Sequence, residues 1–104
     1  KDIAWLNLSG EEMGDDYWKD SEQRSITVYI EANSNRALLL LLNSSPEELE
    51  FTLPSSAWGE SFRCIFDGSK RAATYEPEIA APSAKVKVMQ HSAQVWLVSR
   101  VLAR

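Results

Sequence analysis

Short apolar segments separated by turn-forming residues are the feature that most restricts what this chain can fold into. Residues 26–30 are β-branched or aromatic, and residues 49–53 and 62–66 alternate apolar and polar side chains. β-Branched and aromatic residues favour strands, and strict alternation is typical of a strand with one face in water. No regular alternation of strand and helix patterns is present. This argues against doubly wound α/β folds and the phosphate-binding loops that depend on them.

About seven strands can be predicted along the chain. Strand patterns lie at residues 2–8, 26–30, 38–42, 49–53, 62–66, 86–88 and 95–98. Residues 38–42 have no polar face, so we expect a central strand that is buried on both sides. One short helical turn is expected to begin near Asp15 with Trp18 pointing inward, and residues 71–84 are expected to be irregular. The predicted fold is all-β, an antiparallel β-sandwich or barrel.

The length and charge of the chain limit its organisation and its partners. With 104 residues, 44% of them hydrophobic, the chain can build one core, so we expect a single domain over residues 1–104. Eleven basic residues are spread among 15 acidic ones, a net charge of -4. Binding to nucleic acid needs clustered Lys and Arg, and no basic stripe is present. Nucleic acid is therefore not an expected partner.

The sequence also carries information on the location of the protein. Its longest apolar run, residues 37–42, is far shorter than the roughly 20 residues needed to span a bilayer. No signal peptide precedes the first strand pattern, and a single cysteine excludes an internal disulfide, so we expect a cytoplasmic protein without a membrane partner. Because Lys1 is not a Met and apolar alternation begins at once, we expect the chain to be part of a longer protein.

The residues that most often carry chemistry are few. Cys64 lies in an alternating segment and is expected to be a structural thiol, and the only histidine, His91, lies in a predicted turn. The acidic residues Glu11, Glu12, Asp15 and Asp16 could suggest a Ca²⁺ loop or a carboxylate pair for glycosidic cleavage. They share one loop without a rigid support, so a solvated acidic loop is the favoured interpretation. We therefore predict no catalytic residue, no metal site and no cofactor.

Trp58 is the one tryptophan flanked by loop residues, within the turn-like residues 54–59. Aromatic faces in loops commonly stack on the apolar side of sugar rings, which makes Trp58 a candidate substrate-binding residue for an α-glucan. The ordinary alternative is that Trp58 seals the end of a sandwich, since Trp supplies a large apolar area. Sealing is the favoured interpretation of this residue.

Several motifs, taken in order, resemble one known family. They are Asp2-Ile3-Ala4-Trp5, Gly10, Glu12-Met13, Trp18, residues 39–46, Glu50 to Pro54, Trp58-Gly59, residues 62–67 and residues 92–97. This set is similar to the segment that follows the catalytic barrel in glycogen debranching enzymes of the isoamylase type, within the α-amylase superfamily of glycoside hydrolases. Residues 71–84 match nothing in that pattern.

The resemblance implies a C-terminal Greek-key β-sandwich attached to a (β/α)8 barrel that hydrolyses α-1,6 branch linkages in glycogen. The family's catalytic acids belong to that barrel, which is absent from this chain, so none is carried over and the chain alone is not expected to be an enzyme. The implied partner is the barrel of the same parent chain. We predict that Trp5, Leu6 and Leu8 form the interface with it.

Two other functions remain open at this stage. The domain could be a glucan-binding module that uses Trp58, or a free-standing immunoglobulin-like domain that binds proteins through its edge strands. The leading hypothesis is a non-catalytic accessory domain that packs on the barrel and stabilises it.

Overall fold

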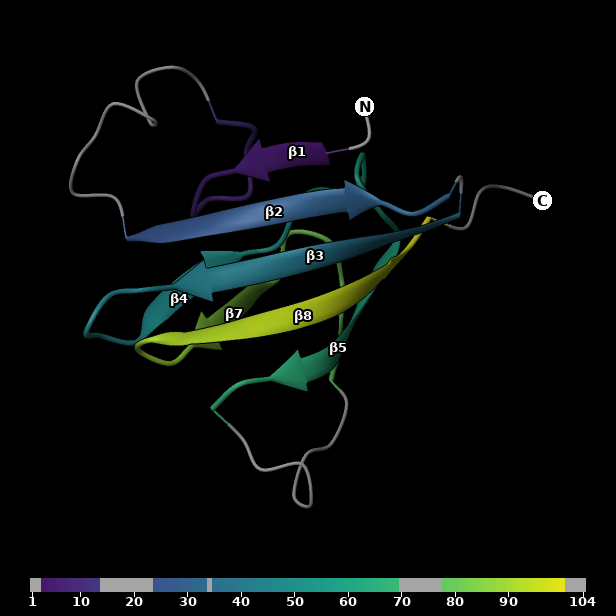
Figure 1. The fold of residues 1–104 in the computed structure, drawn as a ribbon. Coiled ribbons are helices and arrows are strands. Elements are labelled where there is room, and N and C mark those ends of the chain that lie inside the picture. The colour runs from purple at the N-terminus through teal and green to yellow at the C-terminus, as the bar shows by residue number, and fades with distance from the viewer. Residues whose placement is uncertain (1–2, 14–23, 34, 70–77, 101–104) are drawn as a thin grey trace.

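Two antiparallel sheets packed face to face make up the fold (Figure 1). The structure is a computed structural model and describes residues 3–13, 24–33, 35–69 and 78–100. Within those residues the strands are β1 (Ile3–Leu6), β2 (Ser25–Glu31), β3 (Arg36–Asn43), β4 (Leu49–Thr52), β5 (Ser61–Asp67), β6 (Ile79–Ala80), β7 (Lys85–Val88) and β8 (Ser92–Ser99). The described residues contain no helix, and the predicted all-β antiparallel sandwich is confirmed. The helical turn predicted near Asp15, with Trp18, lies outside the described residues.

The larger sheet has the strand order β1-β2-β3-β8-β5-β6, and the smaller sheet consists of β4 and β7. The chain moves to the smaller sheet after β3, returns at β5, moves again at β7 and returns at β8. Strand β8 therefore lies between β3 and β5, and every strand pairing among the described residues is antiparallel.

Strand β3 is central, as predicted, but it is not buried on both sides. Leu39 and Leu41 are fully buried between the sheets, whereas the side chains of Leu38, Leu40 and Leu42 point to the other face and are only partly buried. Successive residues of a strand point to opposite faces. The smaller sheet covers only one face of β3. A run of leucines in a sequence does not show whether one face or both faces of the strand are covered.

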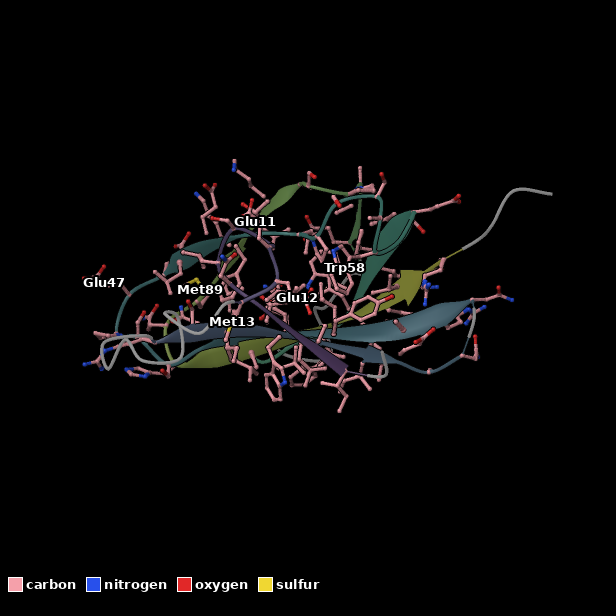
Figure 2. All side chains as sticks on the ribbon, turned by 90° about the horizontal axis from the view of Figure 1, so that it is seen from above. Glu11, Glu12, Met13, Glu47, Trp58 and Met89 are labelled. Carbon is pink, nitrogen blue, oxygen red and sulfur yellow. The ribbon has the colours of Figure 1, made fainter. Side chains whose placement is uncertain are left out.

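The smaller sheet follows the ordinary rule of one apolar and one polar face. Phe51 pairs with Val86 and both are buried, whereas Glu50 pairs with Lys87 on the exposed side. Figure 2, which looks along the layers from above, shows this sheet on one side of the larger one. The core lies between them and contains Trp96, Phe51, Phe62, Leu6, Leu39, Leu41, Leu53, Val88 and Val98, all fully buried.

The stretch predicted to be irregular, residues 71–84, is partly ordered as a strand. Its residues 79–80 form β6 and pair with Phe62 and Arg63 of β5. A two-residue strand is too short to give a periodic signal in a sequence. Strand β5 also contains a β-bulge between Cys64 and Phe66. The Cys64 side chain is buried there, in the environment expected of a structural thiol.

A buried polar chain connects the two sheets. The indole Nε1 of Trp96 donates to Oε1 of Gln94 at 2.9 Å, and Nε2 of Gln94 donates to the Lys87 carbonyl and to Oδ2 of Asp67, each at 3.0 Å. Buried polar groups need such partners because an unpaired group costs about 1–3 kcal/mol. The bond to Lys87 ties β8 to β7 across the core.

Asn43, at the end of β3, forms a second connection to β7. Its Nδ2 lies 2.9 Å from the Glu47 carbonyl oxygen, 3.0 Å from that of Val88 and 3.1 Å from that of Met89. Its Oδ1 accepts a hydrogen bond from the Ser45 amide at 2.9 Å. One buried side chain therefore holds the β3–β4 connection and the end of β7.

We expect Asn43→Ala to lower the free energy of unfolding by about 2–3 kcal/mol, because it leaves buried carbonyl groups without a donor. Urea denaturation measures the change. Glu47→Ala is the matched control, since it removes an exposed side chain and keeps the carbonyl group that Asn43 binds. Equal stability of the two variants would contradict the structural role of the amide.

Candidate functional site

The outer face of the six-stranded sheet, which β4 and β7 leave uncovered, is apolar across its central strands. We call this surface the apolar sheet face. It consists of Ile3 and Trp5 of β1; Ile26, Val28 and Ile30 of β2; Leu38, Leu40 and Leu42 of β3; and Ala93, Val95 and Leu97 of β8. Figure 1 looks directly onto it.

Strand register places these side chains in rows. One row crosses five strands and contains Trp5, Val28, Leu40, Val95 and Phe66 as successive partners. Directly opposite residues have their Cβ atoms about 4.5–5.5 Å apart, close enough for apolar side chains to pack along the row. The row is therefore a continuous apolar strip, in which Trp5 is 42% and Phe66 52% exposed.

A neighbouring row shows where the apolar surface ends. Ile3, Ile30, Leu38 and Leu97 follow one another across β1, β2, β3 and β8, and the next partner is Arg63 of β5. Antiparallel sheets commonly keep one face polar and solvated, and this sheet departs from that rule. A contiguous apolar patch with exposed members such as Trp5 and Phe66 is a candidate interaction surface.

The three residues predicted for a domain interface lie in different environments. Trp5 belongs to the apolar sheet face. The prediction for Leu6 is wrong, because its side chain points to the opposite side of β1 and is fully buried in the core of this domain. Leu8, beyond the end of β1, is partly buried against the same core. The outer residues of β2, β3 and β8 were not predicted as interface residues, although the alternation that places Trp5 on the outer face also places them there.

Trp58 lies in a different place, at a hollow that we call the end hollow. It is lined by Glu12, Tyr29, Glu31, Ala57, Trp58 and Arg100 and has a volume of about 350 Å³. Trp58 is partly buried, and its ring meets that of Tyr29 edge to face, with centroids 4.9 Å apart and an interplanar angle of 69°. The Tyr29 hydroxyl donates to the Trp58 carbonyl oxygen at 2.9 Å. Trp58 and Glu12, which both line this hollow, are labelled close to each other in Figure 2.

An ion pair forms the polar side of the end hollow. Nη1 of Arg100 lies 2.7 Å from Oε2 of Glu31, and about a quarter to a third of each side chain is exposed (30% and 27%). This hydrogen bond raises the pKa of Arg100, which therefore stays cationic. Burial raises the pKa of Tyr29, and the positive charge of Arg100 offsets part of that rise.

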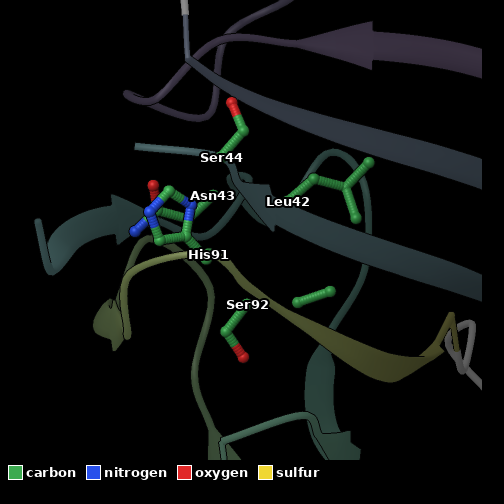
Figure 3. Close-up of a pocket in the computed structure, with 6 residues that line it drawn as sticks. Leu42, Asn43, Ser44, His91 and Ser92 are labelled. Atoms are coloured by element: carbon green, nitrogen blue, oxygen red, sulfur yellow. The ribbon is translucent and has the colours of Figure 1, made fainter. Parts of the chain in front are cut away.

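A second hollow, of about 400 Å³, lies at the β3–β8 end of the sheet (Figure 3). It is lined by Leu42, Asn43, Ser44, His91, Ser92 and Ala93. The Asn43 amide is already bonded within the fold, and His91 is exposed in a turn with φ at 50°. None of the described residues that line this hollow is an acid that could orient the imidazole.

Groups of three or more His, Cys, Asp or Glu side chains placed to hold a metal ion are absent from the described residues. Glu11 and Glu12 are exposed, and Asp15 and Asp16 lie outside the described part of the chain. No helix of sufficient length and apolarity to cross a membrane occurs among the residues that the structure describes.

The sequence matches the family described as "Isoamylase, C-terminal" over residues 2–103, almost the whole chain. The chain belongs to the isoamylase C-terminal domain family. No curated protein matches it. The isoamylase C-terminal domain is an accessory domain of isoamylase-type enzymes, and its membership confirms the resemblance found in the sequence. The family also implies association with the catalytic domain of the same chain.

The raised pKa of Tyr29 predicts how stability depends on pH. Tyr29 ionises at lower pH in the unfolded chain than in the fold, so its contribution is complete below about pH 10 and is lost as pH rises above that value. Tyr29→Phe should lose about 1 kcal/mol at neutral pH with the hydrogen bond to Trp58, and its stability should fall less steeply in alkali. Urea denaturation at several pH values between neutrality and about pH 11 measures both effects. Identical alkaline slopes for the two proteins would contradict the assignment.

Proposed function

We propose that this domain is the non-catalytic accessory domain of a glycogen debranching hydrolase that cleaves α-1,6 branch linkages. In this role it packs on the catalytic (β/α)8 barrel of the same protein and stabilises it. Family membership supports the type of parent enzyme. The observation that carries the packing role is the apolar sheet face.

The size of the apolar sheet face suits an interface between domains. Four strands about 4.8 Å apart, each with two or three outward residues about 6.8 Å apart, give a patch of roughly 400 Å² in projection. Covering it with an equal area of partner buries roughly 800 Å², within the range of about 600–1,500 Å² for interfaces between domains of one chain. A partner of this area is a folded domain, and the outer helices of a barrel offer such a surface.

The edges of the sheet are less suited to binding a protein strand. Strand β1 has four residues, and its outer side is already occupied, because the Met13 amide donates to the Trp5 carbonyl at 2.8 Å and Glu12 bridges Leu6. Strand β6, at the other edge, has two residues. Short or covered edges offer few backbone groups to an added strand. This favours the face over the edges as the interface.

We expect Trp5→Ser to destabilise the full-length protein that contains this chain, because it removes a large exposed aromatic group from the interface. A buried Trp at an interface commonly contributes more than about 1 kcal/mol. The measurement is the half-life of activity at elevated temperature, combined with limited proteolysis between the two domains. Both should show a looser association.

Glu50→Ser is the matched control, since Glu50 is exposed on the opposite outer face of the sandwich. It should leave the half-life and the proteolysis pattern unchanged. If Trp5→Ser behaved like this control, the barrel would not cover the apolar sheet face. Release of linear chains from glycogen by the full-length protein tests the debranching activity separately.

A further inference from the structure

We propose that the end hollow is a secondary binding site for an uncharged α-glucan segment, separate from the catalytic site. The choice of ligand class rests on the proposed function, whereas the presence of a site rests on the geometry of the hollow. The site would hold the polysaccharide near the enzyme and would take no part in bond cleavage.

The hollow combines an aromatic wall with polar groups at its rim. Trp58, Tyr29 and Ala57 form the apolar wall, and Glu31 and Arg100 stand beside it. Sugar rings have an apolar face and an equator of hydroxyl groups, so they need both kinds of surface. Carboxylate oxygens accept hydrogen bonds from hydroxyl groups, and guanidinium N–H groups donate to them.

The charges of the hollow select against ionic ligands. Among the described residues that line the hollow, the guanidinium of Arg100 and the carboxylate of Glu31 are paired with each other at 2.7 Å. Paired charges attract a further ion of either sign only weakly. A neutral, hydroxyl-rich ligand fits this balance best.

The walls are held in place before any ligand arrives. Tyr29 fixes the Trp58 loop through its hydroxyl bond and its ring contact. The Arg100 amide donates to the Asn35 carbonyl at 2.7 Å, which anchors the backbone that carries the guanidinium. Preorganised groups lose less conformational entropy when a ligand binds. The volume of about 350 Å³ lies at the lower end of the range of about 300–1,000 Å³ for small-molecule sites, which suits a short run of sugar units.

The end hollow and the apolar sheet face lie on opposite sides of β2. Tyr29 and Glu31 alternate along this strand with Val28 and Ile30, which point to the apolar sheet face. A catalytic domain that covers that face therefore leaves the end hollow open. The two surfaces can be occupied at the same time.

The test uses the full-length protein with Ala57→Arg, which places a bulky charged side chain in the hollow at an exposed position and removes no core contact. Ser56→Arg is the matched control, because Ser56 is exposed in the same turn but does not line the hollow. Migration of the proteins in native gels with increasing glycogen concentration gives the apparent affinity. We expect Ala57→Arg to bind glycogen about tenfold more weakly than the wild type, with Ser56→Arg unchanged.

Trp58→Phe is a second variant, which shortens the aromatic wall and keeps a ring against Tyr29. It should weaken glycogen binding, and its melting temperature shows whether the fold is kept. Equal retardation of wild type, Ala57→Arg and Ser56→Arg would overturn the proposal, as would the absence of any retardation. If Ala57→Arg lost retardation but the full-length protein had no activity on α-1,6 linkages, the debranching function would be refuted and the glucan site would stand. If the full-length protein cleaved α-1,6 linkages but all variants were retarded equally, the debranching function would stand and the glucan site would be refuted.

Discussion

The two-stranded sheet covers only one face of the six-stranded sheet, and this difference in size between the sheets governs the rest of the structure. Strands β4 and β7 shield the inner face of the larger sheet, where Trp96, Phe51 and Phe62 fill the core. The outer face has the same apolar composition but no cover within the described residues. The two sheets cover the core between them, whereas the outer apolar face of the larger sheet is left uncovered by the smaller one. This arrangement suits a domain that packs against another domain.

The covering strands are held by specific polar contacts as well as by apolar packing. Gln94 donates to the β7 backbone from the middle of the core, and Asn43 donates to it from the end of β3. On the other side, the Thr52 amide donates to the Leu8 carbonyl at 2.9 Å. Gly10 permits this close approach, because a Cβ atom there would lie 2.7 Å from the Thr52 oxygen and its φ is +82°. Gln94 and Asn43 of the larger sheet thus hold β7, and the loop after β1 holds β4.

Local patterns predicted much of the fold because strand alternation is a local property. The strands predicted at residues 26–30, 49–53 and 62–66 all form. Burial of Leu6 and the half-exposure of Leu40 were not predicted, since they depend on which face the second sheet covers. The end hollow could not be predicted from the sequence. Trp58, Glu31 and Arg100 come from three separate segments, and only the placement of β8 beside β3 brings Arg100 next to β2.

The position of Asn43 after five consecutive leucines has a consequence for how the chain finds its pairing. Sheet register is normally specified because a slip by one residue exchanges a buried apolar set for a polar one. In β3 such a slip exchanges leucine for leucine, so residues 38–42 cannot distinguish correct from shifted pairing. The Asn43 amide can, because only the native alignment places it against the Val88 and Met89 carbonyl groups. A single polar side chain thus supplies the alignment signal that the most hydrophobic strand of the domain lacks.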